Sequence, residues 1–278
     1  MSNVTISASD VKALRDKTGA GMMDCKKALS EAGGDMQQAI EYLRKKGQKL
    51  TEKRADREAK EGVVIAQVSD DKTKGVVVRL SCETDFVAKN EEFINLTKEI
   101  TSIALAGFPA DAEGLKALKI GDITIGEKVI EQTGVIGEKI ELAGYAQVEA
   151  AMVAPYIHMG NKAGVLVGLN KASDDIFAAG RDVAMQVAAM KPIALNKEDV
   201  DATVVEKEVE IGKEVARQEG KPEAMLEKIA MGKLNKFFKE KTLMNQMFVK
   251  DNKTTITDFL KSKDPELTVT EFKHITLG

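Results

Sequence analysis

The chain has 278 residues, which is room for about two domains of ordinary size. Its 41 basic residues nearly balance its 44 acidic ones and it has no tryptophan, so we expect neither bulk attraction to nucleic acid nor a base-stacking surface. No apolar run approaches the roughly 20 residues that span a bilayer, and the first residues lack the layout of a signal peptide. With two widely separated cysteines, Cys25 and Cys82, the composition predicts a cytoplasmic protein with free thiols.

Residues 1–50 predict a small domain of three helices. Ser9 or Asp10 can cap the first helix, and Asp35 can cap the third, which Gly47 would end. Helices of this length bury only a small hydrophobic core.

Residues 51–61 form a charged stretch that we interpret as a linker. Basic side chains between Lys45 and Lys60 could bind RNA, but acidic residues alternate with them. This balance favours a solvated helical linker with pairs of opposite charge.

Residues 62–145 predict the first subdomain of an α+β core. Two β-branched runs, 63–68 and 76–80, flank a turn at 69–72 and therefore predict a β-hairpin. A helix capped by Asn90 is expected to follow.

Residues 146–196 repeat this plan as the first part of a second subdomain. Gly164–Leu169 resembles Gly75–Leu80 after an offset of 89 residues, which places a strand near 146–153. We interpret this as a duplication of two hairpin-plus-helix units, each too thin to bury its sheet alone. Because only the first copy carries Thr-Asp-Phe at 84–86, we expect that triplet to be functional.

Residues 197–241 predict an inserted pair of antiparallel helices, broken at Gly220-Lys221-Pro222. Two such arms bury little by themselves, so we expect a coiled-coil contact with a second copy of the chain. The alternative is that the hairpin packs back on its own core. Residues 242–278 return to short helix and strand signals and are expected to complete the second subdomain.

Enzyme motifs are scarce. The two histidines, His158 and His274, stand without CxxC or HExxH patterns, so no metal site is expected. A phosphate-loop-like run at 121–126 is followed by Glu127, whose carboxylate would repel phosphate. The sequence does not exclude a nucleophilic pair of Cys82 and His158, although nothing in it places the two side chains together.

Two motifs closely resemble the bacterial translation elongation factor Ts family: Thr18–Leu29 (TGAGMMDCKKAL) and Glu83–Asn90 (ETDFVAKN). Tyr156–His158 and Gly220–Pro222 resemble the family as well, so the likeness runs along nearly the whole chain. It implies a ubiquitin-associated-like helical domain, a duplicated core and a dimerisation hairpin.

The resemblance also implies a function. A protein of this family would be a guanine-nucleotide exchange factor, not an enzyme, that binds elongation factor Tu–GDP and promotes GDP release so that GTP can rebind. It would need no cofactor of its own. The residues expected to dislodge Mg²⁺ from the partner are Thr84, Asp85, Phe86 and Val87. The residues expected to bind the partner are Leu14, Met22, Met23, Lys26, Ile136 and His158.

Several of these residues could instead have purely structural roles. On composition alone Phe86 is more often a core residue than an exposed wedge, but the resemblance and the difference between the two copies reverse that order. Asp85 by itself would be interpreted as a helix cap. Met22 and Met23 are consecutive, so one of them is expected in the core and one on the surface. The alternative function is a module that binds a peptide or a ubiquitin-like protein through residues 1–50.

Overall fold

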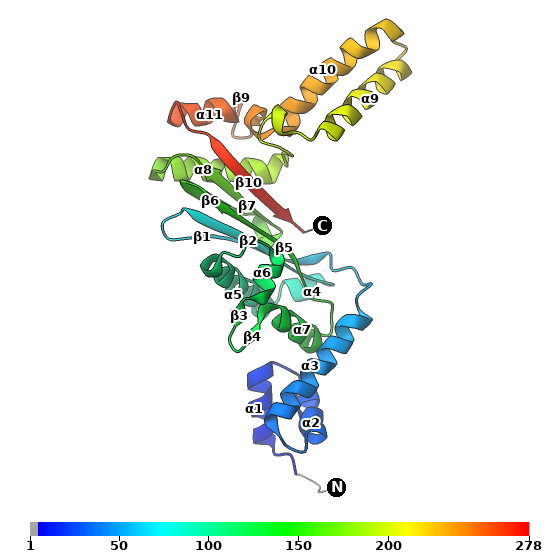
Figure 1. Ribbon diagram of the computed structural model, residues 1–278, viewed down its shortest axis with the longest axis vertical. Helices are drawn as coiled ribbons and strands as arrows, with labels where there is room; N and C mark the ends of the chain where they lie inside the picture. The colour runs from blue at the N-terminus through cyan, green and yellow to red at the C-terminus, as the bar shows by residue number, and fades with distance from the viewer. Residues whose placement is uncertain (1–4, 278) are drawn as a thin grey trace.

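The computed structural model describes residues 5–277, and its three amino-terminal helices form a separate small domain (Figure 1). These helices are α1 (Ala8–Thr18), α2 (Met22–Glu31) and α3 (Met36–Lys53). Ser7, not Ser9 or Asp10, caps α1: its hydroxyl accepts from the backbone N–H of Asp10, whose carboxylate accepts in return. Asp35 caps α3 as predicted.

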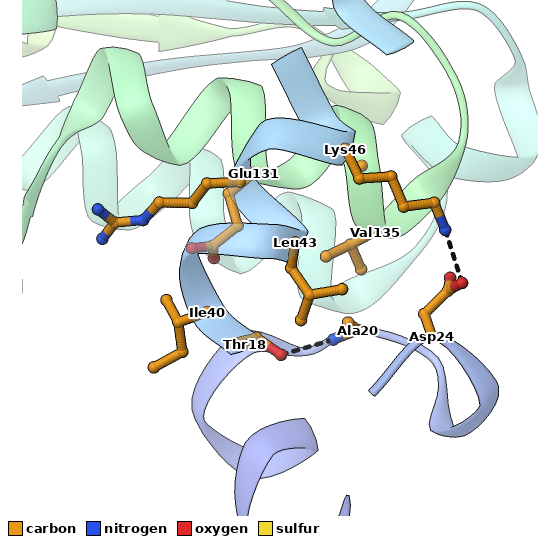
Figure 2. A pocket seen from close by; sticks show the side chains of 10 residues that line it. Thr18, Ala20, Asp24, Ile40, Leu43, Lys46, Glu131 and Val135 are labelled. Carbon is orange, nitrogen blue, oxygen red and sulfur yellow. Dashed lines mark hydrogen bonds and ion pairs between the residues drawn. The ribbon is translucent and has the colours of Figure 1, made fainter. Parts of the chain in front are cut away.

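Helix α3 does not end at Gly47 but continues to Lys53, beyond residue 50. The reason is its contact with α7 (Ile125–Ile136) of the core. A Cβ atom at Gly47 would lie 2.8 Å from the carbonyl oxygen of Ile130, so this glycine permits close helix packing. Figure 2 shows the side chains at this junction, where Val135 of α7 lies beside Leu43 of α3.

The first half of the core is a three-stranded antiparallel sheet in the order β1-β2-β5. Its strands are β1 (Glu61–Val68), β2 (Lys74–Cys82) and β5 (Glu141–Glu149). Helix α5 (Glu91–Gly107), capped by Asn90 as predicted, covers one face with Phe93 and Ile100. Between α5 and β5 lie α6 (Ala112–Ala117), β3 (Lys119–Ile120), β4 (Ile123–Thr124) and α7.

The second half repeats the hairpin-plus-helix plan. It has the sheet order β10-β7-β6, covered by α8 (Asp174–Met190). The strands are β6 (Met152–Ile157), β7 (Ala163–Leu169) and β10 (Val269–Thr276), with the turn η1 (Met159–Asn161) between β6 and β7. The strand expected near 146–153 was misplaced: residues 146–149 belong to β5 in the first sheet, and β6 starts at Met152.

The inner faces of the two sheets pack against each other, so the core has the layers α5, sheet, sheet, α8 (Figure 1). Mostly valine and alanine side chains fill this interface, among them Val64, Val77 and Val153, together with Leu166. The segment after the helical hairpin adds η3 (Leu243–Asn245), β8 (Met247–Phe248), β9 (Asp251–Thr255), α11 (Ile256–Lys263) and β10. Strand β10 pairs with β7, so the carboxyl-terminal segment completes the second sheet as predicted.

Helices α9 (Ala202–Gln218) and α10 (Glu223–Lys241) form the predicted antiparallel hairpin, preceded by η2 (Lys197–Asp199). Gly212 lets the arms approach, since a Cβ atom there would lie 3.1 Å from the Cα of Ala230. The hairpin projects away from the sheets and does not pack back on the core (Figure 1).

Candidate functional site

A single helical turn, α4 (Asp85–Ala88), follows directly after strand β2 and carries the Thr-Asp-Phe triplet. Thr84 caps it, with its hydroxyl 3.4 Å from the backbone nitrogen of Val87. Val87 packs against the core of the first subdomain, whereas the side chain of Phe86 is 82% exposed. The turn therefore presents a large apolar side chain to solvent from an anchored base.

Asp85 lies beside Phe86 as an ionised carboxylate. Lys89, one turn further on, pairs with it at 2.6 Å, and this hydrogen bond and charge hold the pKa of the Asp85 carboxyl below its ordinary value. An exposed phenylalanine next to a carboxylate is an arrangement suited to contact with another protein, not to binding a small molecule.

Ile136 and Thr84 belong to the same end of the core. Ile136 ends α7, and two residues later the carboxylate of Glu138 accepts hydrogen bonds from Thr84. Ile136 therefore lies two residues before a carboxylate that holds the α4 turn, although 50 residues separate Phe86 from Ile136 in the sequence.

His158 is exposed at the end of β6, where it starts the turn η1. Its Nδ1 lies 3.3 Å from the hydroxyl of Tyr156. Both η1 and α4 contact strand β1, so the two motifs flank one strand from different subdomains.

The other predicted contacts lie on the helical domain. Met22 and Met23 are both exposed, at 61% and 77%, and Lys26 on the same helix is exposed too. The expectation that one methionine would be buried was wrong, because Ala20 already fills the core position ahead of Cys25. Leu14 is fully buried in this core, where it supports the fold and offers no surface to a partner.

Cys82 does not form a nucleophilic pair with His158. Its thiol is buried and donates to the carbonyl oxygen of Thr84 at 3.2 Å, while His158 lies beside Tyr156. Burial, with the charges of Glu138 and Glu61, raises the pKa of Cys82 to about 12. The thiol is therefore protonated at neutral pH and is a poor nucleophile.

Ion pairs offset several of the basic side chains in the charged stretch around residues 45–60. Lys45 pairs with Glu41, Lys46 with Asp24, Arg54 with Glu83, and Lys60 with Glu58. This pairing agrees with the solvated-linker interpretation more than with an RNA-binding arm.

Within residues 5–277, no group of three or more His, Cys, Asp or Glu side chains is placed to hold a metal ion. No helix in that same part of the chain is long and apolar enough to cross a membrane. Glu127, next to the phosphate-loop-like run, belongs to a capping box with Thr124 at the start of α7.

Sequence reasoning missed the residues that hold α4 in place. Glu83 accepts from the Arg54 guanidinium and from the backbone N–H of Lys139, both at 2.6 Å, and Glu138 accepts from Thr84. These contacts join segments 29 to 56 residues apart, so no local pattern signals them.

A duplicated core that carries an exposed aromatic turn, a helical domain with exposed methionines and a projecting hairpin together define a protein-binding protein of several domains. Residues 83–278 match the family model described as Elongation factor TS. The chain is 54% identical over 273 residues to elongation factor Ts of Christiangramia forsetii, covering 98% of this chain and 99% of the relative. It is 53% identical to that of Flavobacterium psychrophilum and 54% identical to that of Cytophaga hutchinsonii, each over 99% of both chains. The chain belongs to the elongation factor Ts family.

Proposed function

We propose that the chain is a guanine-nucleotide exchange factor that binds elongation factor Tu–GDP and promotes GDP release during translation elongation. Its membership of the elongation factor Ts family supports this function, and the exposure of Phe86 beside Asp85 is the observation that carries the mechanism. The relatives match along 98–99% of the chain, which does not favour a module built on residues 1–50 alone.

The mechanism follows from how a GTPase holds GDP. The nucleotide is bound mainly through its phosphates, by backbone amides, a lysine and Mg²⁺. Phe86 would insert as an apolar wedge and hold a partner segment away from its GDP-bound position. The carboxylate of Asp85 would disfavour the nearby phosphate and disturb the coordination of the ion. Thr84 and Val87 anchor the turn that presents both side chains.

A wedge of one residue is not sufficient. Weakening nucleotide binding about 10⁴-fold requires about 5.5 kcal/mol of coupling, and burial of one phenylalanine supplies about 1.5–3 kcal/mol. A second contact area must therefore contribute. The proposed members of that area are Met22, Met23, Lys26, Ile136 and His158. All of them except the half-buried Ile136 are exposed.

The proposed exchange factor acts in the cytoplasm, without a cofactor of its own, and catalyses no covalent reaction. It binds elongation factor Tu directly and neither nucleic acid nor membrane. The hairpin at 197–241 forms a homodimer contact, supported by exposed Ile211 and Val215 on one face of α9.

The test is stopped-flow release of a fluorescent GDP from elongation factor Tu. Added in amounts well below those of the GTPase, the chain should speed release of all bound nucleotide, because an exchange factor turns over. Met23→Lys, which places a charge in the helical-domain contact, should raise the concentration needed for half-maximal acceleration. Absence of acceleration with an active cognate GTPase would contradict the proposal.

A further inference from the structure

In helix α4, the usual position in the sequence holds no side chain that could accept a hydrogen bond from the backbone N–H of the capping residue. In a capping box, a Glu or Gln three residues after the capping Ser or Thr accepts the backbone N–H of the cap. In α4 that position is Val87, which has no acceptor in its side chain. The N–H of Thr84 would be left without a partner by local sequence alone.

Glu138 supplies the missing carboxylate from 54 residues away. Its Oε2 accepts from the backbone N–H of Thr84 at 3.1 Å, and its Oε1 accepts from the Thr84 hydroxyl at 2.8 Å. With its proton donated to Glu138, the hydroxyl oxygen is left to accept from the Val87 nitrogen. A chain of hydrogen bonds therefore runs from Glu138 through Thr84 to Val87, the residue that follows Phe86.

A second carboxylate secures the preceding residue. Glu83 accepts from the Arg54 guanidinium and from the backbone N–H of Lys139. Although desolvation opposes it, these hydrogen bonds hold the pKa of Glu83 below its ordinary value. Segments 83–84 and 138–139 thus exchange hydrogen bonds in both directions, which fixes the base of α4 against the end of α7.

We infer that Glu138 is a positioning residue for nucleotide exchange, which holds the α4 turn so that Phe86 is presented in the conformation that the partner meets. The inference rests on the proposed exchange function. A four-residue turn is too short to be stable by itself, so its order must come from tertiary contacts. Without Glu138, binding would have to order the turn, at a cost equivalent to a roughly 5- to 30-fold loss of exchange rate.

The chain contains a matched control. Glu127 makes the same kind of bond at the start of α7, where it accepts from the backbone N–H of Thr124 at 2.7 Å and caps a helix away from Phe86. Glu138→Ala and Glu127→Ala therefore remove equivalent carboxylates, and only the first touches α4. Glu138→Gln keeps one acceptor for the Thr84 hydroxyl and should give an intermediate effect.

The experiment measures GDP release with wild type, Glu138→Ala, Glu127→Ala, Phe86→Ala and the double variant Glu138→Ala/Phe86→Ala. We expect Glu138→Ala to slow release roughly 5- to 30-fold and Glu127→Ala to match wild type. In the Phe86→Ala background, Glu138→Ala should slow release less than it does in wild type, because only Asp85 is left for the turn to present. Wild-type release by Glu138→Ala, or an equal slowing in both backgrounds, would overturn the inference and leave the exchange function standing.

Amide hydrogen exchange separates this inference from the function on which it rests. Glu138→Ala should lower the protection of the Val87 amide while the amides of α5 stay protected, whether or not nucleotide release is accelerated. If Val87 keeps its protection, the inference is wrong. If protection is lost but even wild type fails to accelerate release, the proposed function has failed while the placement of α4 by Glu138 stands.

Discussion

Phe86 and Cys82 lie four residues apart and have opposite environments. Phe86 is 82% exposed, although phenylalanine is normally among the most buried residues, whereas Cys82 is fully buried at the end of β2. An exposed phenylalanine gains nothing for the free protein, so its replacement by alanine should leave the free energy of unfolding unchanged. We therefore attribute this exposed side chain to the proposed contact with the partner and not to stability of the fold.

The Cys82 thiol should make stability depend on alkaline pH. Burial raises its pKa from 9.0 to about 12, so the folded state favours the protonated thiol. Its contribution is fully present below about pH 9 and is lost as the pH rises toward 12. Between about pH 8 and about pH 10, the free energy of unfolding of wild type should fall more steeply than that of Cys82→Ala. Parallel pH profiles in urea denaturation would contradict this.

At the scale of elements, helix α3 joins the helical domain to the core. Local sequence indicates that α3 ends at Gly47, because a glycine after an amphipathic run is a common stop signal. The helix continues because α7 packs against it there, and only the fold shows that Gly47 and Gly134 face each other at this crossing. Caps and hairpin turns were predictable because they are local; this crossing was not.

Two glycine-to-alanine substitutions should change the free energy of unfolding in opposite directions. Gly47→Ala places a methyl group 2.8 Å from the Ile130 carbonyl oxygen, so α3 must move away from α7, at a cost of about 1–3 kcal/mol. Gly232→Ala in α10 meets nothing within 4 Å and should stabilise by about 0.5–1 kcal/mol through its helix propensity. Chemical denaturation checks both values. Equal signs would show that α3 and α7 are not held as described.

At the scale of the whole molecule, the helical domain, the layered core and the hairpin extend in sequence along one long axis (Figure 1). The duplication and the inserted hairpin were predictable, because repeated strand patterns and a charged helical pair are visible in the sequence. The pairing of β5 with β2 was not predictable, because the residues that pair lie between 60 (Ser81 with Glu141) and 75 (Lys74 with Glu149) positions apart in the sequence. The same holds for the candidate site. The motif at residues 84–87 could be recognised in the sequence, but the hydrogen bonds of Glu83 and Glu138 that hold it in place could not be predicted.

The hairpin should control self-association and not exchange. Replacing Ile211 and Val215 together by glutamate places charge on the exposed apolar face of α9. If this face forms the dimer contact, sedimentation equilibrium should show dimers of wild type and monomers of the double variant. A monomeric wild type, or a variant that stays dimeric, would contradict a dimer through this face.

The most direct test compares wild type with Phe86→Ala and Asp85→Ala at saturating concentrations of each chain, using the rate of GDP release from elongation factor Tu. We expect both variants to bind the GTPase and keep wild-type free energies of unfolding, while the saturated release rate falls by about tenfold or more for Phe86→Ala, in line with the burial of one aromatic side chain. A saturated rate equal to that of wild type in both variants would contradict the wedge at α4.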